Sequence, residues 1–204
     1  MSTSRLEAFS DGVVAVLITI MVLELKVPHG IGLDALKPIL PVFLSYVLSF
    51  IYVGIYWNNH HHMLHATGRI NGKILWANLH LLFWLSLMPI TTAWLGENPR
   101  AALPTAVYGG VLVLAAVAYT ILVRAILAFE GSRSPLAVAI GSDVKGRVSL
   151  GLYAAAIPLA FVHHAIADSI YVTVALIWLV PDRRIESRIV EHDEGSETVV
   201  SSPR

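Results

Sequence analysis

The sequence predicts an all-α protein that crosses a membrane six times, and two observations support this fold class. Hydrophobic residues make up 56% of the 204 residues and charged residues only 14%, whereas soluble domains average about 45–50% and about 25%. The apolar residues also gather in six stretches, each close to the roughly 17–25 residues that a membrane-spanning helix needs. These stretches run over about Leu6–Val27, Pro38–Trp57, Ile74–Leu95, Leu103–Phe129, Val148–His163 and Ile166–Val180.

Charged residues, proline or glycine bound each stretch, and the last two stretches are the shortest. A helical hairpin that barely crosses the membrane is therefore the alternative for the last two. Residues 1–185 are expected to form the membrane domain. Residues 186–204 are polar and rich in Ser and Glu, which is typical of a disordered tail.

Lys and Arg are unequally divided between the two sides that six crossings define. Apart from Arg204 at the end of the tail, ten lie on the side of the two termini, and only Lys26, Lys37 and Arg100 lie on the other. Because basic residues concentrate on the cytoplasmic side of membrane proteins, we expect both termini in the cytoplasm and the chain in a cell membrane, such as a bacterial inner membrane. The ten are Arg5, Arg69, Lys73, Arg124, Arg133, Lys145, Arg147, Arg183, Arg184 and Arg188.

The composition also argues against several classes of function. The net charge is zero, so no basic excess points to a nucleic-acid partner. The chain has no cysteine, which removes disulfides and thiolate metal sites. No loop carries paired carboxylates, a Ser/His/Asp arrangement or a glycine-rich phosphate loop. The sequence therefore predicts no enzyme, no cofactor and no small-molecule substrate, with the lipid bilayer as a partner.

The first stretch is unusual because ionisable and polar side chains open an otherwise apolar helix. Ionisable groups at membrane depth are costly and usually face protein or a water-filled path. A projection of the helix places Ser10 and Asp11 away from an apolar face that carries a single hydroxyl. That face is explained either by helix packing or by lining of a pore, and it consists of Val16, Thr19, Ile20 and Leu23.

The pattern of these residues resembles a known channel family. An arginine, three residues, Phe-Ser-Asp and then an apolar run with a threonine is similar to the first-helix motif of bacterial homologues of the lysosomal potassium-channel family, transmembrane protein one-seven-five. The resemblance continues over nearly the whole chain, short of the tail. The residues that carry it are Arg5, Phe9, Ser10, Asp11, Thr19, Pro28, Trp57, His60, His61, Asn78, Pro89, Arg147, Tyr153, Pro158, Trp178 and residues 181–184.

The resemblance implies a homotetramer of six-helix subunits, with the first helix of each lining a central pore for potassium. It also implies that rings of apolar side chains close the pore. The constriction isoleucine of the family falls five residues after the aspartate of the motif, which here is Val16. The next inward positions are Thr19 or Ile20, followed by Leu23. Because valine is one methylene smaller than isoleucine, we expect a wider constriction and a weaker preference for potassium over sodium.

The polar half of the first stretch is expected to bond to the third stretch and hold the first helix in place. A half-satisfied polar network at low dielectric is costly, so these side chains need partners. The alternative is a set of unrelated interfacial contacts. The predicted network contains Arg5, Phe9, Ser10 and Asp11 of the first stretch with Asn78, His80 and Trp84 of the third.

A histidine cluster follows the second stretch and has several interpretations. An interfacial polar cap is the simplest, while zinc binding and a pH-modulating role are alternatives. For the whole chain, a proton or non-selective monovalent cation pathway, a secondary transporter and a non-conducting scaffold are the alternatives to a potassium channel. The cluster consists of His60, His61, His62 and His65.

Overall fold

The computed structural model describes residues 3–131, 134, 136–137 and 143–179, and all the regular structure in these residues is helical. This confirms the all-α prediction for the described residues. The tail predicted for residues 186–204 lies outside them. The helices are α1 (Thr3–Leu23), the 3-10 helix η1 (Leu33–Leu36), α2 (Leu40–His65), α3 (Gly72–Leu85), α4 (Met88–Glu97), α5 (Ala102–Glu130), α7 (Val144–Val162) and α8 (His164–Leu179).

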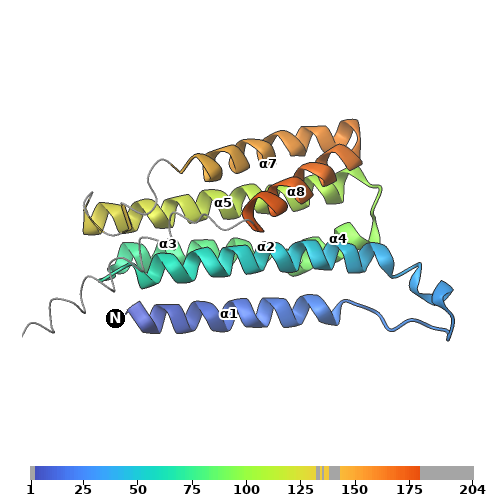
Figure 1. Ribbon diagram of the computed structural model, residues 1–204, viewed down its shortest axis with the longest axis horizontal. Helices are drawn as coiled ribbons and strands as arrows, with labels where there is room; N and C mark the ends of the chain where they lie inside the picture. The colour runs from blue at the N-terminus through green and yellow to red at the C-terminus, as the bar shows by residue number, and fades with distance from the viewer. Residues whose placement is uncertain (1–2, 132–133, 135, 138–142, 180–204) are drawn as a thin grey trace, which may run out of the picture.

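The helices run along the long axis of an elongated bundle (Figure 1). We call the end where α1 begins the proximal end; α2 and α5 end there, and α3 and α7 begin there. The distal end holds the connection from α1 to α2, the turn from α4 to α5 and the turn from α7 to α8. Helix α1 lies at one edge of the bundle beside α2, so much of its surface has no neighbour within the chain.

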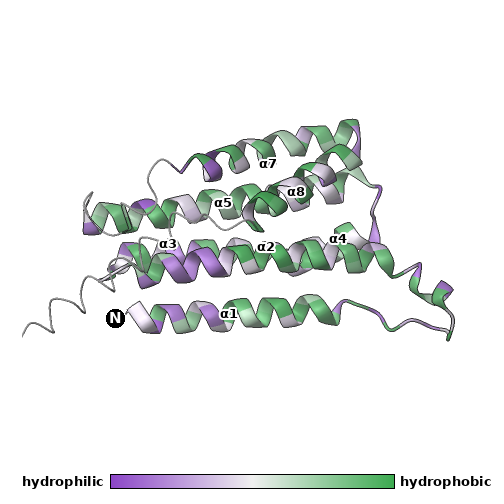
Figure 2. Cartoon of the chain, viewed as in Figure 1, coloured by the Kyte–Doolittle hydropathy of each residue, from purple (hydrophilic) through white to green (hydrophobic). Residues whose placement is uncertain are grey.

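Among the residues that the structure describes, four segments are long and apolar enough to cross a membrane. They are α1, α2, the α3–α4 pair taken together and α5, and α8 is a shorter apolar helix. Figure 2 shows hydrophobic residues along most of the helices, with hydrophilic residues gathered in the proximal parts of α1 and α2. The chain is therefore a multi-pass membrane protein.

Two predicted stretches differ from the helices in the structure. The second was expected to end near Trp57, but α2 continues to His65. In this extension the side chains of Asn59 and His60 are hydrogen-bonded within the chain. The third was expected to be continuous, but it breaks between α3 and α4 around Ser86. Proline lacks an N–H and its ring clashes with the carbonyl four residues earlier, so Pro89 ends one helix and sits in the first turn of the next.

A set of buried polar groups joins the helices in the distal half. The Tyr52 hydroxyl of α2 donates to the carbonyl of Tyr171 in α8 over 2.6 Å. The Tyr171 hydroxyl donates in turn to the Thr105 carbonyl of α5 over 3.1 Å. The Ser49 hydroxyl accepts from the Thr92 hydroxyl of α4 and bonds to the Tyr108 hydroxyl of α5. These bonds hold α2, α4, α5 and α8 together beside an apolar core.

Helix α5 approaches α8 closely at Gly109, which gives a first testable prediction. A Cβ at Gly109 would overlap the Tyr171 hydroxyl and lie 2.8 Å from the ring carbon that bears it. Overpacking of this kind costs about 1–3 kcal/mol, so Gly109→Ala is expected to lower the free energy of unfolding by that amount. Thermal unfolding in detergent, followed by circular dichroism, measures this loss.

The neighbouring Gly110 provides a matched control. A Cβ there would meet nothing within 4 Å, and alanine favours a helix over glycine by about 0.5–1 kcal/mol. We therefore expect Gly110→Ala to leave the melting temperature unchanged or to raise it slightly. Equal melting temperatures for the two variants would contradict the close contact at Gly109.

Candidate pore helix and its polar anchor

Helix α1 has two distinct faces. The buried face packs on α2, α3 and α4, and its members are Leu6, Ser10, Val14, Leu17 and Met21. The opposite face is open, although it is apolar: Val16 is 54% exposed, Ile20 41% and Leu23 80%. Thr19 and Phe9 are exposed as well. The four residues predicted to line a pore therefore share the face of α1 that the chain itself does not cover.

The hydroxyl of Thr19 is oriented by its own helix. It donates to the Val16 carbonyl over 2.8 Å. Because a hydroxyl has one proton and two lone pairs, this bond leaves the oxygen able to accept but not to donate. On the open face, Thr19 therefore presents acceptor capacity, which suits a cation.

The buried side of α1 is anchored by a chain of three polar side chains. Ser10 donates to the Leu6 carbonyl over 2.9 Å and accepts from Nδ2 of Asn78 over 3.0 Å. Oδ1 of Asn78 lies 2.6 Å from Nε2 of His60. Since Oδ1 can only accept, Nε2 of His60 carries the proton. All three side chains are at most 5% exposed, so α1, α2 and α3 are joined by a buried network whose members have partners.

Two further bonds join α1 to α2 at the edge of this anchor. Trp57 donates from Nε1 to Oδ1 of Asp11 over 2.9 Å. One turn along, Nδ1 of His61 lies 2.7 Å from Oε1 of Glu7. The His61 ring stacks on the Trp57 ring with centroids 6.0 Å apart. The spacing of four residues on both helices gives an antiparallel ladder in which each acidic residue of α1 has a ring N–H donor on α2.

Only part of the predicted polar network comes together in the structure. Ser10 does bond to Asn78, but Asp11 bonds to α2 instead of α3. His80 and Trp84 bond to each other, with Trp84 Nε1 donating to His80 Nε2 over 2.9 Å. His80 is exposed on α3, and the hydrogen bond described for its side chain is the one to Trp84. Arg5 is exposed and makes no hydrogen bond or ion pair with the residues that the structure describes.

The prediction missed His60 as a member of the anchor. The sequence suggested an interfacial cap for all four histidines, whereas His60 is 5% exposed and bonds to Asn78. The signal was its helical spacing, because Val53, His60 and Leu64 fall on one face of α2, and all three are buried. Within the described ranges, no group of three or more His, Cys, Asp or Glu side chains is placed to hold a metal ion.

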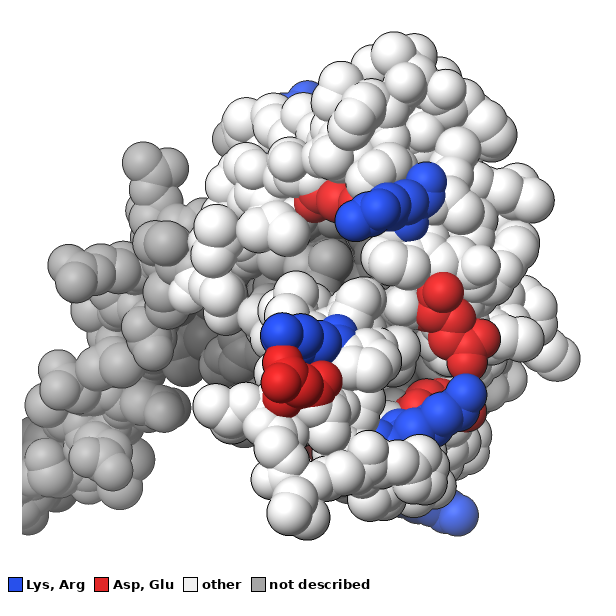
Figure 3. All heavy atoms as spheres, turned by 90° about the vertical axis from the view of Figure 1, so that its right-hand side faces the viewer, with Lys and Arg blue, Asp and Glu red and all other residues white. Residues whose placement is uncertain are grey.

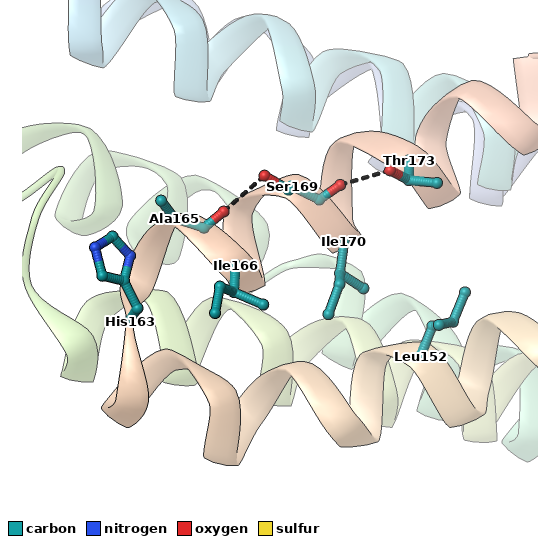
Figure 4. A pocket seen from close by; sticks show the side chains of 7 residues that line it. All are labelled: Leu152, His163, Ala165, Ile166, Ser169, Ile170 and Thr173. Atoms are coloured by element: carbon teal, nitrogen blue, oxygen red, sulfur yellow. Dashed lines mark hydrogen bonds between the residues drawn. The ribbon is translucent and has the colours of Figure 1, made fainter.

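A groove of about 670 Å³ lies between α7 and α8 near the distal end. Figure 4 shows that its two hydroxyls are already used within α8: Ser169 donates to the Ala165 carbonyl and Thr173 to the Ser169 carbonyl. The side chains of Leu152, Ile166 and Ile170 make the rest of the lining largely apolar. His163 is the remaining polar residue of the lining.

The distal end carries few charged side chains, and both signs are interspersed over it (Figure 3). Two exposed ion pairs lie in this region: Lys26 with Glu97 at 3.3 Å, and Lys37 with Asp34. Because exposed pairs of this kind contribute at most about 1 kcal/mol, they orient the connection from α1 to α2 only weakly. The described part of this end has no single-sign field that would strongly repel cations.

Comparisons with known proteins identify relatives of this chain. The family described as endosomal/lysosomal potassium channel TMEM175 matches residues 5–89, a range that contains the open face of α1 and its polar anchor. A potassium channel of a Chryseobacterium species is 56% identical over 192 residues, which cover 94% of this chain and 100% of that protein.

A solved structure and an animal relative extend these matches. The crystal structure of a lysosomal potassium-selective channel TMEM175 homolog from Chamaesiphon minutus superposes with a TM-score of 0.76 at 29% identity, covering 87% of this chain and 96% of that one. The endosomal/lysosomal proton channel TMEM175 of Gallus gallus is 38% identical over 73 residues, covering 30% of this chain and 15% of that protein.

Proposed function

The chain belongs to the TMEM175 family of potassium channels, and from that premise we propose that several copies of it form a passive potassium-permeable pore lined by α1. The copies number four in this proposal, as the sequence resemblance implies. The permeant ion is potassium, and it moves down its gradient without a cofactor. The bilayer is the other partner of the assembly.

One observation carries the assignment of α1. Its apolar face is open in the single chain, while hydrogen bonds hold its opposite face against α2 and α3. A helix fixed on one side and uncovered on the other is suited to line a cavity between copies. The acceptor oxygen of Thr19 on the open face supports this assignment, since a helix that only packed against lipid would gain nothing from it.

An apolar ring at Val16 would act as both gate and selector. A narrow passage lined by apolar side chains does not hold water or a hydrated ion, so it is closed until it widens. Opening requires the α1 helices to splay or rotate about the anchor at Ser10. A ring of Thr19 oxygens, one turn further, would replace part of the hydration shell of a passing cation.

The proposed topology has six crossings with both termini in the cytoplasm. To the four long spans it adds α7, of 19 residues, and α8, of 16 residues. At about 1.5 Å per residue, α8 is about 24 Å long. This is slightly less than the thickness of the hydrocarbon core, which is about 30 Å. The proximal end would then be cytoplasmic, in a bacterial inner membrane.

Ion flux through purified protein in liposomes tests the proposed function. A potassium gradient followed by a sodium gradient, with a fluorescent readout of flux, is expected to give faster flux for potassium. Slow flux that saturates with potassium concentration would indicate a transporter instead. Absence of flux of either ion through folded protein would indicate a scaffold.

A proton or non-selective cation pathway is the second candidate. Valine at the constriction leaves a wider passage than isoleucine would, and the related Gallus gallus protein is named a proton channel. The same liposomes loaded with a pH-sensitive dye distinguish the two. Acidification without potassium flux would favour the proton pathway, and equal rates for potassium and sodium would favour the non-selective one.

Thr19→Val is expected to reduce the preference for potassium over sodium. The substitution keeps the shape of the side chain but removes the acceptor oxygen from the open face. Thr19→Ser keeps the oxygen and is expected to retain most of the preference. Reversal potentials in bilayer recordings measure the preference, and an unchanged value for Thr19→Val would show that this oxygen does not contact the ion.

A further inference from the structure

Two polar side chains at similar depth in the bundle have unused hydrogen-bonding groups. His80 accepts from Trp84 Nε1 at its Nε2 atom, so the proton of the neutral ring is on Nδ1. That Nδ1–H donor has no acceptor among the described residues. The side-chain amide of Asn58 on α2 is exposed and likewise bonds to no described residue.

The two side chains lie at the same level along the bundle axis. The bond between His60 and Asn78 fixes the register of α2 against the antiparallel α3. Asn58 and His80 are each two residues from that bond in the distal direction, which corresponds to about 3 Å along either helix. A plane perpendicular to the bundle axis therefore passes close to both.

The two side chains point to opposite outer sides of the α2–α3 pair. Two residues along an α-helix turn the direction by about 200°, so Asn58 points about 160° away from His60, which faces α3. His80 points about 160° away from Asn78, which faces α2. A direct bond between the two is therefore not available within one copy.

Both side chains lie inside the length of their helices and away from the helix ends. His80 is eight residues from the first residue of α3, or about 12 Å along the axis, and Asn58 is seven residues from the last residue of α2. Polar groups that contact hydrocarbon are costly and are normally paired inside protein. The Nδ1–H donor of His80 lies on one side of the chain, and the amide oxygen of Asn58 lies on the other side at the same level. In two adjacent copies, the donor of one can therefore meet the acceptor of the next.

We propose that Nδ1–H of His80 donates to Oδ1 of Asn58 in the neighbouring copy, so that the α3 side of each subunit contacts the α2 side of the next. The proposal rests on the proposed function, which places α1 at the centre of several copies. A contact between two different sides of the same chain is a head-to-tail interface, and it can close into a ring. The occupant of both sides is a second copy of this chain.

Cross-linking between two single-cysteine variants tests the contact, and the natural absence of cysteine gives a clean background. Asn58→Cys and His80→Cys chains, carrying different tags, are co-expressed and treated in membranes with a short thiol cross-linker. We expect cross-linked dimers that contain both tags, and we expect only background product when either variant is expressed alone.

Ile121→Cys serves as the matched control in place of His80→Cys. Ile121 is exposed on α5, at a similar level because the Tyr119 hydroxyl bonds to the Asn59 carbonyl. Asn58→Cys with Ile121→Cys is expected to give background product only. Equal cross-linking with either partner would overturn the assigned contact.

A second measurement tests the hydrogen bond itself. Asn58→Leu and His80→Leu are each expected to shift the purified protein towards smaller species in native electrophoresis, and the double variant to shift it no further than either. Additive shifts would overturn the bond. Potassium flux separates this inference from the proposed function. Flux through the cysteine variants with no mixed dimer overturns the contact alone. No mixed dimer together with no flux through folded wild-type protein overturns the pore as well.

Discussion

Val16→Trp is expected to lower potassium flux by more than about tenfold, the largest functional effect of any single substitution in α1. A rate change of that size corresponds to at least about 1.4 kcal/mol in the barrier to permeation. Val16 is 54% exposed in the single chain, so the larger ring has room to be accommodated without disturbing the fold. In a pore lined by α1, one indole from each copy would fill the constriction. Liposome flux under a potassium gradient measures the effect.

Val16→Asn is expected to act in the opposite direction. A ring of asparagine side chains, one from each copy, holds water at the constriction. The passage therefore stays wet, potassium flux rises and the preference for potassium over sodium falls. Val22 provides a control, because it is the same residue type in the same helix, is 43% exposed and lies off the face that carries Val16. Val22→Trp and Val22→Asn should leave flux near the wild-type rate. If both Val16 variants had the potassium flux of the wild-type protein, this face of α1 would pack against protein or lipid and would not line a pore.

Local pattern is enough to divide α1 into its faces. The 3.6-residue period places Val16, Ile20 and Leu23 together, and in the structure they share the uncovered face while Leu17 and Met21 are buried. This works because the faces of a straight helix depend only on residue number. The function of the uncovered face does not follow from the period, since lipid contact, packing between copies and pore lining all use apolar residues.

Contacts between helices were harder to predict, because they depend on register. Ser10 and Asn78 were both identified as polar residues at membrane depth, and they do meet. His80 is only two residues from Asn78, and it faces outward because two residues turn a helix by about 200°. His60 was interpreted with its neighbours as a polar cap, since nothing in the local sequence states that α2 continues past it and pairs it with α3.

Proline marks a possible helix break in the sequence, but a long apolar stretch around it favours the prediction of one continuous helix. The third stretch is apolar on both sides of Pro89, so its length favoured one continuous helix. The structure places this proline in the first turn of α4, where its missing N–H costs no hydrogen bond. A second proline, Pro158, lies inside α7 without ending it. The residue type alone therefore does not decide whether a membrane helix breaks.

Asn78→Leu is expected to cause the largest loss of stability, because Asn78 is the central member of the buried anchor. The substitution leaves Nε2–H of His60 without an acceptor, and Ser10 loses the donor to its oxygen. A buried polar group without its partner costs about 1–3 kcal/mol, so the total loss in the free energy of unfolding is expected to be about 2–4 kcal/mol. Unfolding of the purified protein in detergent by increasing denaturant concentration measures it. Ser169→Ala is the control, since that exposed hydroxyl bonds only to its own helix, and its effect should stay within about 0.5 kcal/mol.

The triple variant Ser10→Ala, His60→Leu and Asn78→Leu separates the cost of stranded polar groups from the cost of lost shape. Replacing all members of a buried network by apolar groups can be nearly neutral, so the triple variant should be more stable than Asn78→Leu alone. Its potassium flux then shows what the anchor contributes beyond stability. If the anchor sets the position of α1, the triple variant conducts with an altered preference for potassium even though it is folded. A triple variant that is less stable than Asn78→Leu would instead show that shape, and not hydrogen bonding, holds α1 against α2 and α3.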